Sequence, residues 1–138
     1  EPTIRAIRPG GRGDVTESHI AWEQTRGVPA LPSPLYVKPY LYTISRDNIL
    51  YCLQAETGDI VWQERLGGNY SASPLLADGR IYITSEEGVT TVIEPGAEYK
   101  KLATNKLDGK TMASIAVSGG NFFIRSGDAL FCIGTPPR

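Results

Sequence analysis

A Ser-Pro-Leu tripeptide recurs along the chain at intervals of about 40 residues. Two full copies and one weaker copy are present: Ser33-Pro34-Leu35, Ser73-Pro74-Leu75 and Ser114-Ile115-Ala116. Each serine precedes an aromatic residue by nine positions, and these aromatic residues are Tyr42, Tyr82 and Phe123. Trp22 and Trp62 also stand 40 residues apart. Self-similarity at a fixed period indicates stacked structural units, and it restricts the possible folds more than any single motif does.

Short strands separated by turn residues fill each unit. The first complete unit predicts strands over Ala30–Tyr36, Tyr40–Ser45, Ile49–Gln54 and Asp59–Glu64. The second predicts Ser71–Ala77, Arg80–Ser85, Val89–Glu94 and Tyr99–Thr104, and the third predicts Met112–Ser118, Asn121–Ser126 and Ala129–Ile133. Two further strands, Thr3–Ile7 and Ser18–Glu23, precede them. Asp78-Gly79 and Gly119-Gly120 supply the positive φ angles of two-residue hairpins. Since no capped stretch has a 3.6-residue period, almost no helix is expected.

Several strands are apolar on both faces, whereas a sheet with one face in water would alternate apolar and polar residues. Examples are Tyr40–Ile44, Ile81–Ile83 and Phe122–Ile124. Four short antiparallel strands in about 40 residues, covered on both sides, are what the blades of a β-propeller require. The predicted fold is therefore all-β, with about three to three and a half blades in an incomplete ring. A β-sandwich or an irregular barrel is the alternative.

The units divide the chain into four parts of one domain. Residues 1–27 are expected to form a partial blade with its third and fourth strands, and residues 28–68 and 69–109 two complete blades. Residues 110–138 should form the first three strands of a further blade. Because uncovered faces and open strand edges favour association, we expect a homo-oligomer through the incomplete terminal blades. A dimer of about six blades is its simplest form.

Charge and composition exclude several classes of protein. Lys and Arg number 14 against 15 for Asp and Glu, and the net charge of -1 argues against nucleic acid or an anionic membrane as the main partner. With 41% hydrophobic and 21% charged residues, the chain should fold rather than be disordered. No apolar run approaches the roughly 18 residues of a membrane span. The amino end has no basic stretch followed by an apolar one, so no signal peptide is expected.

The segment Tyr51–Trp62 carries a recognisable pattern, because Trp62 follows the turn Thr57-Gly58 by four residues. This pattern resembles the signature of the PQQ-like (quinoprotein-type) β-propeller repeat, as do the Ser-Pro strand starts and the Asp78–Tyr82 hairpin. The sequence departs from the family pattern at Cys52 and Gln54. In the second unit Glu94–Ala97 lacks the Thr-Gly turn, and Leu102 is expected to stand in for Trp.

The resemblance implies the C-terminal portion of a larger bacterial propeller. The family includes periplasmic assembly factors and sensor domains of bacterial membrane proteins, so it implies a periplasmic or otherwise extracytoplasmic location. Quinoprotein dehydrogenases of the family bind PQQ and calcium through acidic residues, Asn and a pair of adjacent cysteines. That set of residues is not visible in this sequence.

The signature residues are expected to be structural. Gly58 permits a tight reversal between the third and fourth strands. Trp62 should lay its ring between neighbouring blades, with its indole N–H bonded to an acceptor at the rim, and Trp22 should do the same for a preceding blade. We assign ten residues to this structural signature: Trp22, Trp62, Gly58, Thr57, Ser33, Pro34, Ser73, Pro74, Asp78 and Gly79.

No catalytic, cofactor-binding or metal-binding residue is predicted. Cys52 and Cys132 are 80 residues apart at matching positions of two units. A separation of two blades should exceed the Cα–Cα distance of a disulfide, so both thiols should be free. We expect both to be buried as small apolar residues. His19 has no ligand or triad partner at suitable spacing, which favours a turn or edge-strand residue.

The remaining motifs are weak. Asp47-Asn48 and Glu86-Glu87 are interpreted as ordinary solvated turn residues. Arg12-Gly13-Asp14, a tripeptide read by integrins, should lie in an exposed connection, and Asn69-Tyr70-Ser71 is a formal glycosylation sequon.

The sequence favours a non-enzymatic scaffold or binding module, because propellers present loops for contact with a protein or a ligand. No cofactor is expected, and the partner is a protein or a small ligand rather than nucleic acid. The alternative is a fragment of a PQQ-dependent oxidoreductase whose cofactor site lies on blades that this chain lacks.

Overall fold

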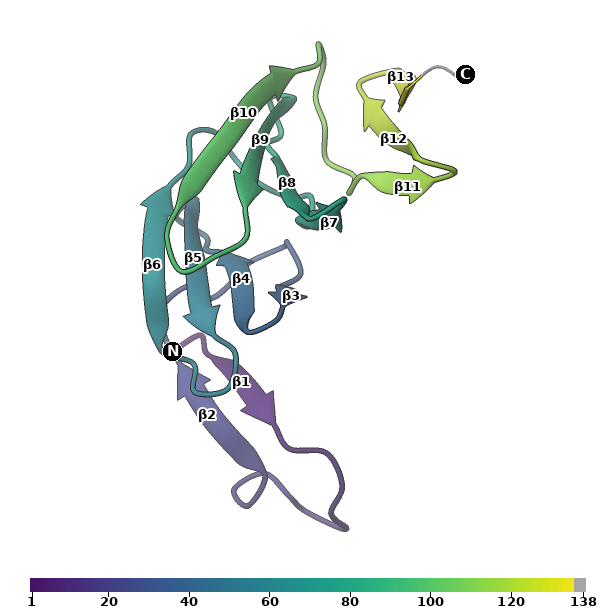
Figure 1. Ribbon diagram of the computed structural model, residues 1–138. Coiled ribbons are helices and arrows are strands. Elements are labelled where there is room, and N and C mark those ends of the chain that lie inside the picture. Colours follow the sequence, from purple (N-terminus) through teal and green to yellow (C-terminus); the bar gives the residue numbers. More distant parts are fainter. Residues whose placement is uncertain (136–138) are drawn as a thin grey trace.

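The computed structural model describes residues 1–135, which form thirteen β-strands and no helix. The strands make four antiparallel sheets that follow one another along an arc (Figure 1). The first sheet contains β1 (Ile4–Ile7) and β2 (Ile20–Gln24). The second contains β3 (Leu35–Val37), β4 (Tyr40–Ile44), β5 (Ile49–Gln54) and β6 (Ile60–Arg65). The third contains β7 (Leu75–Ala77), β8 (Arg80–Thr84), β9 (Val89–Glu94) and β10 (Lys100–Lys106). The fourth contains β11 (Ala116–Ser118), β12 (Asn121–Ser126) and β13 (Ala129–Ile133).

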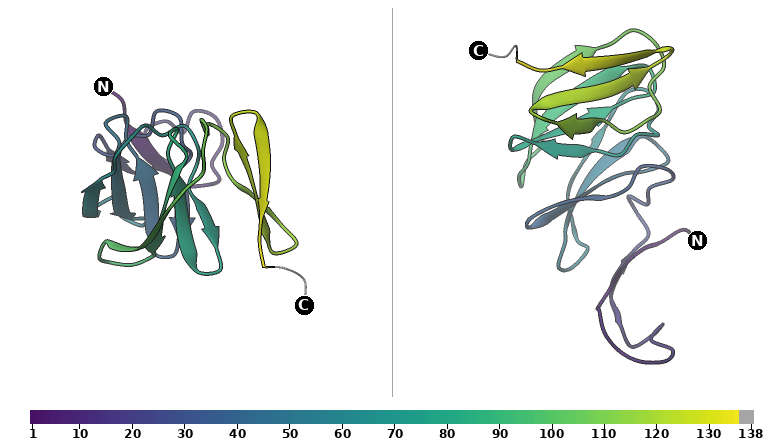
Figure 2. Two further views of the ribbon diagram at one scale, coloured as in Figure 1. Left: turned by 90° about the horizontal axis from the view of Figure 1, so that it is seen from above. Right: turned by 90° about the vertical axis from the view of Figure 1, so that its right-hand side faces the viewer.

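Within every sheet each strand lies beside the strand that follows it in the sequence. The sheets themselves stand side by side, with the fourth sheet next to the third (Figure 2). The hairpin between β7 and β8 turns at Asp78 and Gly79, whose φ angles are 45° and 69°. These positive values are those of a two-residue turn that matches the twist of the strands. The expectation of an all-β chain of short antiparallel strands is confirmed.

The best-packed region of the molecule lies between the second and third sheets. Side chains from both sheets are almost fully buried there, namely Tyr42, Ile44, Leu50, Cys52, Leu66 and Tyr70 on one side and Ile81, Ile83 and Ile93 on the other. Consecutive residues are buried along β5 and β9, so the second and third sheets are covered on both faces. This explains why their central strands lack the alternation of a half-exposed sheet.

The first strand of each unit is shorter than predicted. The sequence suggested Ala30–Tyr36, Ser71–Ala77 and Met112–Ser118, whereas β3, β7 and β11 have three residues each. The peptide N–H groups of Ser33 and Ser73 donate to a serine side chain of the next unit instead of to a neighbouring strand. Pro34 and Pro74 have no N–H to donate. For β3 and β7 the hydrogen-bonded ladder between strands therefore begins at the residue that follows the Ser-Pro pair.

One further assignment is wrong. In the second sheet Trp62 lies opposite Cys52, and in the third sheet the residue opposite Val92 is Ala103. Leu102 instead falls in the register shift between Lys101 and Ala103, with a 44% exposed side chain. Leu53 pairs with Ile60, but its counterpart Ile93 pairs with Lys101 and not with Lys100. The register of β10 is thus displaced by one residue, so Ala103 and not Leu102 takes the place of Trp.

Candidate functional site

Both tryptophans make a hydrogen bond to the neighbouring sheet. Trp22 on β2 donates its Nε1–H to the carbonyl oxygen of Ala55 over 3.0 Å, and Trp62 on β6 donates to Gly96 over 2.9 Å. Each acceptor lies in the turn between the third and fourth strands of the next sheet. The Trp62 ring also packs against Tyr99, with centroids 5.5 Å apart. Since indole rings prefer an apolar contact with a partner for the N–H, both side chains connect successive sheets.

Two features of the turn before β6 require glycine at position 58. Gly58 closes this turn with φ at +78°, and its N–H donates to the carbonyl of Gln54 over 2.8 Å. A Cβ atom at this position would lie 2.5 Å from Cε3 of Trp22, a separation that real side chains do not tolerate. The Thr57 hydroxyl stabilises the turn by donating to Asp59 over 2.6 Å. The sequence indicated the reversal, but the close approach of Trp22 was not visible in it.

The repeated serines form hydrogen bonds from one unit to the next. The N–H of Ser33 donates to Oγ of Ser73 over 2.9 Å, and the N–H of Ser73 donates to Oγ of Ser114 over 2.9 Å. Each bond therefore joins the start of one innermost strand to the start of the following one. This contact gives the 40-residue repeat of serine a physical reason.

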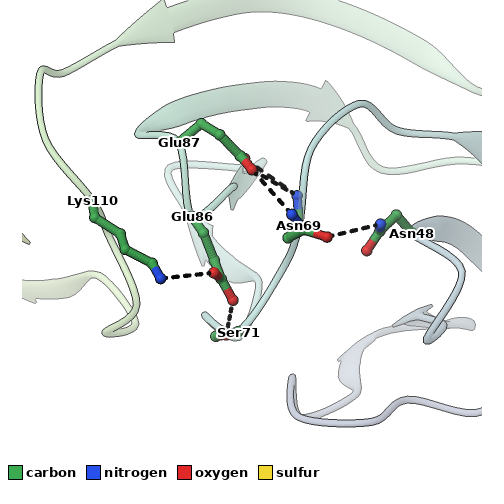
Figure 3. A network of polar contacts seen from close by, with 6 residues as sticks. All are labelled: Asn48, Asn69, Ser71, Glu86, Glu87 and Lys110. Carbon is green, nitrogen blue, oxygen red and sulfur yellow. Dashed lines mark hydrogen bonds and ion pairs between the residues drawn. The ribbon is translucent and has the colours of Figure 1, made fainter.

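The long connection between the second and third sheets is held by a polar network around Glu87 (Figure 3). The N–H of Asn69 donates to Oε2 of Glu87 over 3.2 Å, and Nδ2 of Asn69 donates to its Oε1 over 3.3 Å. Asn48 donates to Oδ1 of Asn69 over 3.4 Å. The Glu87 carboxylate accepts hydrogen bonds from the Ser85 side chain, from the backbone N–H of Glu87 and from Asn69. These bonds hold the pKa of Glu87 below its usual value.

Glu86 makes the second half of this network. Its carboxylate accepts a hydrogen bond from the Ser71 hydroxyl, and Lys110 Nζ lies 3.6 Å from its Oε2 (Figure 3). Glu86 and Glu87 lie in the turn, as the sequence indicated, and Glu87 is exposed. Both carboxylates also bind segments that enter or leave the third sheet, which the sequence did not indicate. The sequon Asn69-Tyr70-Ser71 lies inside this packed connection, where the Tyr70 side chain is only 8% exposed.

A groove of about 650 Å³ separates the first sheet from the second. Ile4, Ala6 and Trp22 line one wall, and Tyr36 and Leu41 line the other. Tyr36 is 57% exposed, and Leu41 is only half-buried. Its counterpart one unit later, Ile81, is fully buried against the second sheet. In the described residues β1 pairs only with β2, so the groove also carries an open strand edge.

The cysteines are both free, as expected, but they differ in burial. Cys52 is fully buried between the second and third sheets, and burial raises the pKa of its thiol to about 11. Cys132 on β13 is exposed, so the expectation that it fills a core position is wrong. Within residues 1–135, no sheet covers the outer side of the fourth sheet, which leaves this thiol in contact with solvent.

The other residues singled out in the sequence lie near the first sheet. His19 is half-buried before β2, and its Nδ1 lies 2.8 Å from the Ser18 hydroxyl. Arg12-Gly13-Asp14 is exposed in the β1–β2 connection, where the Asp14 carboxylate accepts the N–H of Thr16 over 2.9 Å. Over residues 1–135, no three His, Cys, Asp or Glu side chains gather into a group that could hold a metal ion. The same residues contain no helix able to span a membrane.

Solved structures with the same arrangement of sheets are β-propellers. BamB from Moraxella catarrhalis superposes with a TM-score of 0.62 at 17% identity, covering 78% of this chain and 34% of that chain. Quinohemoprotein alcohol dehydrogenase ADHIIG from Pseudomonas putida HK5 gives 0.58 at 15% identity, covering 70% of this chain and 16% of that one. A europium-containing methanol dehydrogenase gives 0.54 at 20% identity, covering 69% and 20%. The chain thus spans about a third or less of the length of these structures. The similarity confirms the predicted propeller fold.

No curated protein sequence matches the chain significantly. A family model does match it, over residues 3–98, and its description is outer membrane protein assembly factor BamB. This range includes the first and second sheets and ends in the turn before β10. The matched residues contain Trp22, Gly58, Trp62 and the first two Ser-Pro pairs, whose contacts join the sheets. The chain therefore belongs to the PQQ-like β-propeller family of the outer membrane protein assembly factor BamB.

Proposed function

We propose that this chain is a non-enzymatic segment of a propeller that binds another protein during the assembly of outer membrane proteins. The family match over residues 3–98 carries this proposal, because it names an assembly factor. An assembly factor of the outer membrane would act outside the cytoplasm, so we infer an extracytoplasmic location. The tryptophans, which a ligand-binding site would use for stacking, are engaged between sheets instead.

The groove beside the first sheet is the surface that best fits a protein partner. It combines apolar side chains such as Tyr36 and Leu41 with the open edge of β1. An extended segment that pairs with an open strand gains main-chain hydrogen bonds, and adjacent apolar side chains then select the sequence of that segment. We infer that the partner supplies a strand with apolar residues on one face.

Site-specific photocrosslinking in the periplasm of a Gram-negative host tests this function. A photoreactive residue at position 36, in the groove, should crosslink to a protein of the outer membrane assembly machinery. The matched control places the same residue at position 61, because Val61 is exposed on β6 outside the groove. Equal crosslinking from both positions, or none from position 36, contradicts the proposal.

We further propose that residues 1–27, 28–68, 69–109 and 110–138 act as four blade units, with the ten signature residues in structural roles. The first and fourth sheets have two and three strands in the described residues, which leaves strand edges that favour association of copies. Sedimentation of the 138-residue chain at micromolar concentration should give a dimer or a larger species. A stable monomer contradicts the oligomer without affecting the binding proposal.

The oxidoreductase alternative is tested separately. The chain is mixed with PQQ and calcium, and the absorbance and fluorescence of the cofactor are followed. We expect no change, because the proposed function requires no cofactor. A saturable spectral change would favour the oxidoreductase over the scaffold.

A further inference from the structure

The interface between the third and fourth sheets contains smaller side chains than the interface before it. Strand pairing fixes the equivalence, since Ile44 lies opposite Leu50 in the second sheet and Thr84 lies opposite Thr90 in the third. Strand pairing also makes Trp62 equivalent to Ala103. Tyr70 corresponds to Thr111, because the preceding residues Asn69 and Lys110 each accept a backbone N–H from a turn of the following sheet. Four large side chains of one interface are thus replaced by three threonines and an alanine in the next.

A cavity of about 280 Å³ lies between the third and fourth sheets, and Thr90 is the one of these four replacements that lines it. Its walls are mainly apolar and include Tyr82, Ile115, Phe122, Ile124 and Ile133. The rings of Tyr82 and Phe122 meet edge to face, with centroids 4.8 Å apart. In the preceding interface the position of Thr90 is taken by Leu50, whose larger side chain is fully buried.

The interface between the third and fourth sheets contains polar side chains on β10 and in the connection that follows it. Asn105 and Lys106 line the cavity from β10 and are exposed to solvent. Lys106 takes part in none of the ion pairs of the described residues. Its ammonium group is therefore available to a ligand at the rim of the cavity. Thr111 is fully buried, and its Oγ1 has no hydrogen-bond partner in residues 1–135. Thr111 does not line the cavity, so its hydroxyl is not counted among the groups that would contact a ligand.

We propose that this cavity binds a small monocarboxylic acid with an aromatic or branched apolar body. The apolar body would contact Phe122 and the isoleucines, and the carboxylate would pair with Lys106 and accept a hydrogen bond from Asn105. An engineered apolar cavity of about 150 Å³ is large enough for benzene, so this one has room for a substituted ring. A charge at the rim and an apolar interior are the usual features of sites for such ligands.

Calorimetric titration of the 138-residue chain with 3-phenylpropionate tests the proposal. The expected result is saturable binding with a Kd below about 1 mM, the weak end of specific recognition. The neutral analogue 3-phenylpropanol has the same apolar body and should bind about tenfold more weakly, because it lacks the charge. Absence of saturable binding, or equal affinity for the two compounds, overturns the proposal.

Three variants separate the contribution of the Lys106 charge to ligand binding from the contribution of the cavity volume. Lys106→Met should remove the preference for the acid and leave the affinity for the alcohol unchanged. Lys101→Met, on the same strand and exposed but outside the cavity, is the matched control and should bind both compounds like the parent chain.

Thr90→Leu introduces the residue that the preceding interface has at this position, and by filling the cavity it should abolish binding of both compounds. Undiminished binding by Thr90→Leu, or an unchanged preference in Lys106→Met, overturns the site. If circular dichroism shows that Thr90→Leu does not fold, the comparison of Lys106→Met with Lys101→Met decides the question.

Discussion

Trp62 donates its Nε1–H to the carbonyl oxygen of Gly96, 2.9 Å away in the next sheet. The N–H of the same glycine donates to the Tyr42 hydroxyl over 2.9 Å, and Cys52 Sγ approaches its carbonyl oxygen at 3.8 Å. Three side chains of the second sheet thus hold one glycine backbone of the third. The interface between these sheets is stabilised by hydrogen bonds as well as by apolar packing.

Replacing Trp62 should strongly destabilise the interface between the second and third sheets. Trp62→Ala removes a large ring that contacts Tyr42 and Tyr99 and leaves the Gly96 carbonyl without its donor. We expect a loss of about 3 kcal/mol in the free energy of unfolding, the lower end for truncation of a buried aromatic, because Trp62 is only half-buried. Urea denaturation measures it. A loss below about 1 kcal/mol would show that the ring contributes little to the packing of sheets.

A pair of glycine variants separates backbone strain from the contact with Trp22. Gly58 and Gly79 both have positive φ angles, 78° and 69°, but only at Gly58 would a Cβ atom meet another side chain. Gly79→Ala should lower stability by about 1–2 kcal/mol through the left-handed backbone alone. Gly58→Ala should cost at least about 1 kcal/mol more, because the ring of Trp22 must also move. Thermal or urea unfolding of both variants checks the difference, and equal losses would argue against a tight contact.

The two thiols should differ in reactivity while the protein is folded. Cys132 is exposed, whereas Cys52 is buried and its raised pKa of about 11 keeps it protonated at pH 8. Because the thiolate is the reactive form, a thiol reagent should modify one cysteine per folded chain and both after denaturation without reductant. Mass spectrometry of the peptides identifies the sites. Modification of Cys52 at the rate of Cys132 would show that the interface opens readily.

Alkaline pH should destabilise the interface between the second and third sheets. Burial raises the pKa of Tyr42 from 10.0 to about 12, so between these values the folded protein retains a proton that the unfolded chain releases. The stabilising effect is therefore complete below pH 10 and is lost as pH rises towards 12.

Tyr42→Phe removes this titration, and also the acceptor for the Gly96 N–H. The variant should lose about 1 kcal/mol at neutral pH but show a shallower decline of melting temperature above pH 10. Identical alkaline profiles for the two proteins would show that another group is responsible.

Much of the fold followed from local sequence patterns. β5, β9, β12 and β13 have the bounds that alternating turn residues and apolar runs predict, because short strands between glycine-containing turns leave little freedom in register. The first strands β3 and β7 were predicted too long because serine side chains of the next unit accept the backbone N–H groups that precede them. That competition depends on the neighbouring unit, so no single stretch of sequence reveals it.

The contacts between units were the least predictable part. Glu86 and Glu87 look like turn residues, yet they bind Ser71 and Asn69, which precede them by 15 and 18 residues. Ala103 takes the place of Trp62 because the pairing register of β10 is displaced by one residue, which a strict 40-residue spacing conceals. The cavity beside Thr90 lies between two sheets, and Thr90 is equivalent to Leu50 through strand pairing, so the linear sequence does not reveal it.

The serine bonds all run in one direction, since each unit donates an N–H to the hydroxyl of the unit that follows. Ser73, the middle serine, is both a donor and an acceptor, so duplication of a whole unit in the gene restores each bond without any new residue. A duplication of any other length would displace the serine and break the row. The number of blades in such a protein can therefore change during evolution by whole units, while the way in which blades are joined stays the same.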